Sequence, residues 1–232
     1  MKHIFYKILI IFLVCENLFA QTADEVILKM GDSYSTNKCV SYSLKYNLYK
    51  DENSSKIYDG YNGIYKKNES NSIYQKIKNT EFILKDKVLV KVMHDDKTIT
   101  VSKVTPFSMG DNTIKSLMQY CSISNFKQLK AGWQIILIPK QNSELEYSKI
   151  IIFIDTDFRI SWQKFYYNIE IDFSKNFQKR DGSKPVLEIV YSNYNNNKIE
   201  NSIYNLKKYI DFKGNKMAPS LAYSKYILED YR

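Results

Sequence analysis

The chain has little of what flexible or multidomain proteins usually contain. Its 232 residues include seven glycines, four prolines, three cysteines and two histidines. So few glycines and prolines argue against long flexible linkers, and one domain is expected at this length. Hydrophobic residues make up 44% and aromatic residues 15% of the chain, which argues against intrinsic disorder.

Basic charge is in excess but nowhere concentrated. Lys and Arg number 34 against 25 Asp and Glu, a formal net charge of +9. No basic run is longer than a pair, as at Lys66-Lys67 and Lys207-Lys208. Nucleic-acid binding normally shows as a basic patch or stripe, so dispersed lysines indicate a solvated surface and no nucleic-acid partner. Attraction to an anionic membrane surface stays open.

Motifs for catalysis and for cofactors are missing from the sequence. There is no P-loop, GxGxxG, GxSxG or CxxC. His94 precedes two aspartates, and a hairpin turn explains that cluster better than a metal or acid–base site. Asp155 and Asp157 could be paired carboxylates for glycoside hydrolysis, but a tight turn between strands explains them better. We expect no enzyme, no metal and no cofactor.

The first twenty residues have the order of a secretory signal. Lys2 and Lys7 flank a basic start, residues 8–14 are apolar, and Ala20 offers a small residue for cleavage. The apolar run is far shorter than the ~20 residues of a membrane-spanning helix. Cys15 lacks the small neighbour usual for lipid attachment. The prediction is a signal peptide over 1–20, a single domain over 21–232, no transmembrane anchor in the mature chain, and a periplasmic or secreted location.

Two cysteines, Cys39 and Cys121, would remain after cleavage. An oxidising compartment would allow them to pair. The sequence leaves open whether they form a disulfide or stay as small buried apolar groups.

Amphipathic patterns predict two helices. Thr22 and Glu25 form a capping box, and apolar residues at helical spacing behind it predict a helix from Ala23 to Tyr34. After a break at residues 106–112, a second helix is expected from Thr113 to Cys121, capped by Asp111 or Asn112.

From Cys39 onward the apolar period changes to two, which predicts strands. Val40, Tyr42, Leu44 and Tyr46 alternate with polar residues in the first strand. Strands so close in sequence must be antiparallel, because a parallel return needs a crossover of a dozen or more residues. Further strands are expected over 56–66, 72–78, 81–84, 88–93, 98–104, 133–138, 148–155, 158–167 and 186–192.

The predicted fold is α+β. One apolar face of such a sheet must be covered, and a sheet of about ten strands would curl. We therefore expect a curved antiparallel sheet, an open half-barrel, with the N-terminal and inserted helices packed on its concave face. Imperfect filling would leave an apolar cavity between the layers. The expected lining residues are Ile27, Met30, Tyr34, Leu44, Tyr46, Leu117 and Met118. Residues 200–232 remain an unassigned C-terminal extension.

This order of elements resembles the periplasmic lipoprotein-carrier superfamily (LolA/LolB-like), with its related sigma-regulator sensor domain. The resemblance rests on the signal-like start, the helix over 23–30, the strand over 40–46 and the meander from Ile73 through Val101. It implies an unclosed barrel, capped by helices, that shields the acyl chains of lipoproteins. The stretch from Lys208 to Arg232 does not look like the carrier's final strands.

Two functions follow from these patterns. The first is a non-catalytic, exported carrier or sensor of the cell envelope that binds a lipid or a lipoprotein acyl chain. The second is a structural or protein-interaction module of the envelope, with a filled core, an envelope protein as partner and no small ligand, since packing alone explains each apolar residue.

Overall fold

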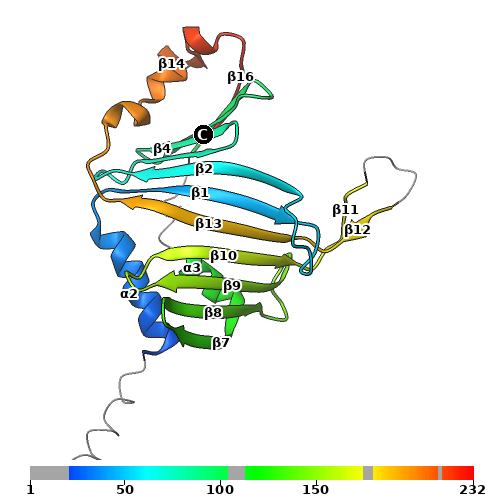
Figure 1. Ribbon diagram of the computed structural model, residues 1–232. Helices are drawn as coiled ribbons and strands as arrows, with labels where there is room; N and C mark the ends of the chain where they lie inside the picture. The colour runs from blue at the N-terminus through cyan, green and yellow to red at the C-terminus, as the bar shows by residue number, and fades with distance from the viewer. Residues whose placement is uncertain (1–20, 104–112, 175–179, 214–215) are drawn as a thin grey trace, which may run out of the picture.

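One large sheet dominates the protein (Figure 1). The computed structural model describes residues 21–103, 113–174, 180–213 and 216–232. The predicted signal peptide, the predicted break at 106–112 and the predicted caps Asp111 and Asn112 lie outside the described residues. The elements of the first half are α2 (Ala23–Thr36), β1 (Val40–Tyr49), β2 (Asp59–Lys67), β3 (Ile73–Ile77), β4 (Thr80–Lys85), β5 (Val88–Met93), β6 (Thr98–Lys103) and α3 (Thr113–Tyr120). Those of the second half are β7 (Cys121–Leu129), β8 (Gly132–Pro139), β9 (Tyr147–Asp155), β10 (Ile160–Tyr167), β11 (Ile171–Asp172), β12 (Gly182–Ser183), β13 (Val186–Asn195), β14 (Ile210–Lys213), β15 (Lys216–Pro219) and β16 (Ile227–Tyr231), with short 3-10 helices at Asn201–Tyr204, Leu206–Lys208 and Leu221–Tyr223.

Helix α2 begins as the sequence predicts. The Glu25 amide donates to Thr22 Oγ1 at 3.3 Å, and the Thr22 amide donates to Glu25 Oε2 at 3.0 Å. This capping box satisfies two amides that the first turn would otherwise leave unpaired. The helix is two residues longer than predicted and ends at Thr36. No helix among the described residues has both the length and the apolar character that crossing a membrane requires.

The 12-stranded sheet has the order β16-β6-β5-β4-β3-β2-β1-β13-β10-β9-β8-β7. Two antiparallel meanders, β1–β6 and β7–β10, meet through β13, which lies between β1 and β10 (Figure 1). The expectation of a wholly antiparallel sheet is wrong at one edge, where β16 runs parallel to β6. β16 reaches β6 from the far end of the chain, so the short-turn rule that makes neighbouring strands antiparallel does not apply to it.

Alternation along each strand gives the sheet two different faces. On β1, Tyr42, Leu44 and Tyr46 point to the side that carries α2, and Ser43 and Lys45 point to the other side. We call these sides the helix face and the back face. Residues directly opposite in a ladder share a face, so the pairings extend this assignment to every strand of the sheet.

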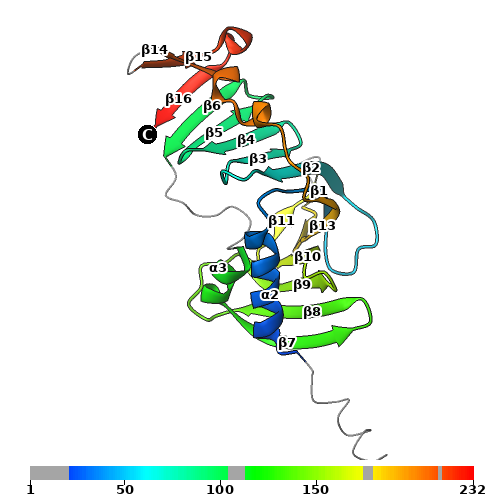
Figure 2. The same ribbon diagram turned by 90° about the vertical axis from the view of Figure 1, so that its left-hand side faces the viewer.

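Helix α2 closes a first hydrophobic core on the helix face. Val26 and Met30 of α2 pack with Ile135, Ile152 and other side chains of β1, β8 and β9. We call this cluster the helix core. Figure 2 shows α2 and α3 together on the same side of strands β7–β10.

A second core lies on the back face, at the other end of the sheet. Ile83 pairs with Tyr74, which pairs with Lys66, which in turn pairs with Ser41 on the back face. Ile83 therefore points away from α2. It is buried there with Val90, Val92, Ile99 and Val101, under Tyr209 and Ile210 of the C-terminal segment. We call this cluster the C-terminal core.

The expectation that the two helices cover the sheet is thus incomplete. Residues 201–213 and 216–226 lie over strands β3–β6 (Figure 2). Their apolar residues are separated by short turns, so no helical or strand period marks them as a covering layer.

Candidate functional site

Beyond α2, the helix face carries apolar side chains that belong to neither core. Phe82 pairs with Gln75, whose partner Tyr65 lies opposite Tyr42 on the helix face. Leu89 and Met93 of β5 share that face with Phe82. All three side chains are half-buried, and none belongs to the helix core or to the C-terminal core.

Two further residues connect these side chains to the helix core. Ile77 of β3 and Leu84 of β4 are half-buried on the helix face and pack against the helix core. We call the five residues Ile77, Phe82, Leu84, Leu89 and Met93 the strip. Successive rows of side chains in the strip lie two residues apart along the strands, so three rows span about 13 Å.

Stacked tyrosines border the strip on the side of β1 and β2. The rings of Tyr46 and Tyr61 stack with centroids 4.7 Å apart. Burial raises the pKa of Tyr46 to about 12, against a smaller lowering by its hydrogen bond with Gln75. The hydroxyl therefore stays neutral at physiological pH. Gly63 makes room for this stack, because a Cβ there would lie 2.9 Å from the Lys76 carbonyl oxygen and 3.2 Å from the Tyr46 ring.

A closed ring of hydrogen bonds ties α2 to β10 and β13. The Ile160 amide donates to the Tyr34 hydroxyl at 3.2 Å, and the Tyr34 and Tyr194 hydroxyls lie 2.6 Å apart. The Tyr194 hydroxyl donates to the Ile160 carbonyl at 2.8 Å. Burial raises the pKa of both tyrosines, so the ring is neutral. These bonds hold the C-terminal end of α2 against the sheet.

A buried lysine supports the same end of α2. Lys67, only 5% exposed, donates from its ammonium to the Tyr34 carbonyl at 2.8 Å. The last turn of α2 has no basic residue of its own. Lys67 therefore supplies, from β2, the positive charge that a helix C-terminus favours.

The residues predicted to line a cavity gather around the helix core. Ile27, Met30, Tyr34, Leu44 and Tyr46 are buried members of it. Leu117 and Met118 of α3 are half-buried and pack against it. The chain thus brings all seven residues together, and the strip, which sequence reasoning missed, adjoins them through Ile77 and Leu84.

Asp155 and the residues after His94 make the turns expected of them. Asp155 Oδ1 accepts from the Asp157 and Arg159 amides at 3.0 and 2.9 Å, which closes the turn between β9 and β10. Residues 94–97 form the turn between β5 and β6. Within the described residues, no group of three or more His, Cys, Asp or Glu could hold a metal ion. Cys39 and Cys121 are both buried, and neither is in a disulfide.

The side chain of His94, however, belongs to a buried network on the back face. Its Nε2 lies 2.7 Å from Glu81 Oε1. Glu81 Oε2 accepts from the Tyr209 hydroxyl at 2.6 Å and from the Tyr74 hydroxyl at 2.9 Å. Tyr226, whose hydroxyl lies 3.0 Å from His94 Nδ1, adds a second contact from the C-terminal segment.

The hydrogen bonds determine the charge of Glu81. Burial alone would raise the pKa of this carboxyl, but the hydrogen bonds from Tyr209, His94 and Tyr74 outweigh burial and lower it. Glu81 is therefore an ionised carboxylate at neutral pH, and it joins the C-terminal segment to β4 and β5. We call this group the Glu81 network.

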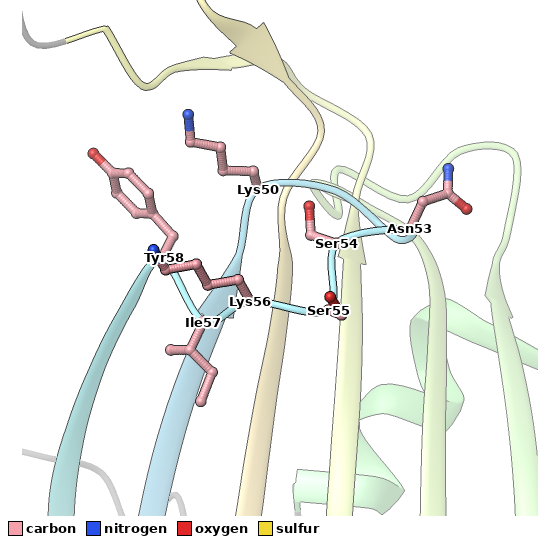
Figure 3. Close-up of a pocket in the computed structure, with 7 residues that line it drawn as sticks. All are labelled: Lys50, Asn53, Ser54, Ser55, Lys56, Ile57 and Tyr58. Atoms are coloured by element: carbon pink, nitrogen blue, oxygen red, sulfur yellow. The ribbon is translucent and has the colours of Figure 1, made fainter.

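A cavity of about 460 Å³ lies at the turn between β1 and β2. Lys50 and Tyr58 border it and point the same way from the ends of the two strands (Figure 3). The Lys50 ammonium already pairs with Asp181 and lies 5.4 Å from the centre of the Tyr58 ring. Its charge is thus largely satisfied within the chain, and the rest of the lining is the polar turn over 53–56 with Ile57.

The fold and the strip define a class of protein: a large, mostly antiparallel sheet with few helices and an apolar surface on the helix-bearing side. No protein-family model matches the chain, and a search of curated proteins matches nothing. Solved structures that match the chain include a LolA superfamily protein, from the superfamily that the sequence resembles.

Three of these structures illustrate the match. A LolA superfamily protein from Nitrosomonas europaea is 13% identical with a TM-score of 0.38, over 80% of this chain and 98% of its own. A putative outer membrane lipoprotein-sorting protein domain from Vibrio parahaemolyticus is 11% identical with a TM-score of 0.36, over 79% and 97%. The Mycobacterium tuberculosis lipoprotein LppX is 7% identical with a TM-score of 0.35, over 75% and 97%. Similarity at this level gives no evidence about function.

Proposed function

We propose that the protein is a non-catalytic carrier or sensor of the cell envelope that holds a lipid or a lipoprotein acyl chain on the strip. The observation that carries this proposal is the half-buried state of Phe82, Leu89 and Met93 outside both cores. Covering such side chains with an apolar chain gains about 0.8 kcal/mol for each buried CH₂.

The finer architecture belongs to the same proposal. In it, the sheet bends as an open half-barrel around α2 and α3. The seven predicted lining residues, from Ile27 to Met118, form the wall against which the inner end of the ligand packs. Ile77 and Leu84, the two strip residues that pack against the helix core, join that wall to Phe82, Leu89 and Met93. Export to the periplasm or beyond rests on the predicted signal over residues 1–20.

Ligand extraction tests the proposal directly. The protein is purified from its expression host without detergent and extracted for mass spectrometry, and its binding of a fluorescent fatty acid is titrated. We expect about one lipid per chain, or submicromolar to micromolar binding of the fluorescent probe. A ligand-free protein that also ignores the probe contradicts the proposal.

A pair of variants locates the site. Leu89→Asp places a charge on the strip and should weaken probe binding about tenfold or more, because an acyl chain cannot solvate a carboxylate. Leu221→Asp is the matched control, since Leu221 is 88% exposed and lies in the C-terminal segment. Equal effects of the two substitutions on probe binding would show that the probe does not bind on the strip.

A protein-interaction module with a filled core is the second candidate function. The burial of Ile27, Met30, Tyr34, Leu44 and Tyr46 in one packed cluster favours it. A pull-down from envelope fractions at low salt should then yield one specific protein partner, and a clean lane in repeated trials would count against this candidate.

A further inference from the structure

One charged side chain lies in the middle of the strip. Lys91 of β5 pairs with Phe82 on one side and with Thr100 of β6 on the other. Residues two apart in a strand share a face, so Leu89 and Met93 lie before and after it. Lys91 is half-buried. Apolar side chains thus border its stem on three sides.

No described residue neutralises the ammonium of Lys91. Among the residues that the structure describes, none forms a hydrogen bond or an ion pair with Lys91. The nearest acidic side chain in its row is Glu229, two strands away, opposite Thr100. The Glu229 carboxylate accepts from the Thr100 hydroxyl at 3.3 Å, and the Tyr231 hydroxyl lies 3.5 Å from it. A few other lysines are paired, as Lys164 is with Glu188 at 3.2 Å.

The chemistry of this row differs from that of the rows beside it. The rows on either side of Lys91 offer Leu84 with Leu89, and Ile77 with Met93. The row of Lys91 differs by its ammonium, since its Thr100 hydroxyl has counterparts in Thr80 and Thr98 of the row of Met93, and the Gln75 amide lies beyond Phe82. An ammonium beside apolar surface binds the anionic end of an amphiphile, while the apolar surface binds its chain.

We infer that Lys91 binds the anionic head group, a carboxylate or a phosphate, of an amphiphile whose chain lies along the strip. This inference rests on the proposed function and names the ligand class for the same site: a single-chain anionic amphiphile. Lys91 is then the residue that sets specificity for charge, and Phe82, Leu89 and Met93 supply affinity for the chain.

Three probes that share a chain and differ in the head group test the inference. Hexadecanoate, hexadecyl phosphate and hexadecanol are titrated, below their critical micelle concentrations, into the full chain and into Lys91→Met. We expect the two anions to bind the unmodified protein about fivefold or more tightly than the alcohol, and Lys91→Met to abolish that preference with the alcohol's affinity kept within about twofold. The ratio between hexadecanoate and hexadecyl phosphate tells which head group fits.

Two further variants complete the test. Lys76→Met removes a lysine from the back face of β3, two strands away, and should leave the anion preference intact. Lys91→Glu should reverse the preference and favour hexadecylammonium over hexadecanoate. Equal binding of the anions and the alcohol by the unmodified protein, or a preference that survives in Lys91→Met, overturns the assignment of Lys91 while leaving the strip as an apolar site. If the unmodified protein binds none of the probes, the proposed function is wrong, and so is the head-group assignment.

Discussion

The two cores of this protein lie on opposite faces of one sheet and are closed by opposite ends of the chain. On the helix face, α2 from the N-terminal end covers β1 and β8–β10 with apolar side chains and neutral tyrosine hydroxyls. On the back face, the C-terminal segment covers β3–β6 and is held by the ionised carboxylate of Glu81. The strip, which no described element covers, lies directly behind the C-terminal core, on strands β3–β5. The second core thus supports from behind the surface that we propose binds the ligand.

The largest expected effect on stability is a cavity in the helix core. Ile152 is fully buried, and Ile152→Ala should lower the free energy of unfolding by about 4 kcal/mol, from lost burial and from the cavity left behind. Chemical denaturation followed by circular dichroism measures this loss. Ile83→Ala in the C-terminal core is the matched variant, since Ile83 is equally buried. An unfolding curve with two transitions, of which each variant shifts only one, would show that the cores unfold separately.

Loss of the Glu81 carboxylate should affect the C-terminal core alone. Glu81→Gln replaces an acceptor oxygen by a donor and leaves at least one of the groups Tyr74, His94 and Tyr209 without its bond. We expect a loss of about 3 kcal/mol and faster proteolysis of residues 201–232. Glu229→Gln, on the exposed β16, should cost less than about 0.5 kcal/mol. Equal proteolysis of the two variants would contradict this role of Glu81.

The pH dependence of the stability lost in Glu81→Gln distinguishes the two cores further. The folded pKa of Glu81 lies below its ordinary value, so its ionised form stabilises the protein above that value. As pH falls from about 4.5 through the lowered folded pKa, this contribution disappears, and the stability difference between the unmodified protein and Glu81→Gln should shrink. Parallel denaturation series at pH 7 and pH 3.5 measure it. The deficit of Ile152→Ala should not shrink in this way, and a constant deficit for Glu81→Gln would place the carboxylate outside the network.

The smallest expected effect concerns the hydroxyl ring of the helix core. Tyr194→Phe removes the donor to the Ile160 carbonyl and the partner of Tyr34, which should cost about 1 kcal/mol. Tyr49→Phe, whose hydroxyl donates to Glu188 on the back face, removes a comparable bond far from α2. Hydrogen exchange should then accelerate in α2 for the first variant and not for the second. Identical exchange in α2 would mean that the ring does not hold the helix.

The helix core could be predicted because local patterns encode it. The capping box at Thr22, the helical spacing of Ile27, Met30 and Tyr34, and the strict alternation of β1 each follow from a few neighbouring residues. The predicted strand 88–93 is confirmed with the same bounds. Strand β7 was missed because it follows α3 without a turn, so Cys121, predicted as the end of the helix, is the first residue of the strand.

The C-terminal core could not be predicted, because long-range contacts create it. Tyr209 and Ile210 are adjacent in a segment without a helical or strand period, and Glu81 resembles any polar residue at a strand end. The parallel pairing of β16 with β6 joins residues more than 120 positions apart. The sequence held one signal for the strip. Residues 88–93 are apolar on both faces, except for Lys91, and this pattern indicates a strand that is covered on both faces.

Photo-crosslinking tests the central claim most directly. A fatty acid with a diazirine in its chain is bound to the full protein, irradiated and mapped by peptide mass spectrometry. The account predicts adducts within residues 77–93, on the strip, that compete with unlabelled hexadecanoate and weaken in Leu89→Asp. Adducts confined to the back face of β8–β10, or spread over the surface without competition, would contradict it.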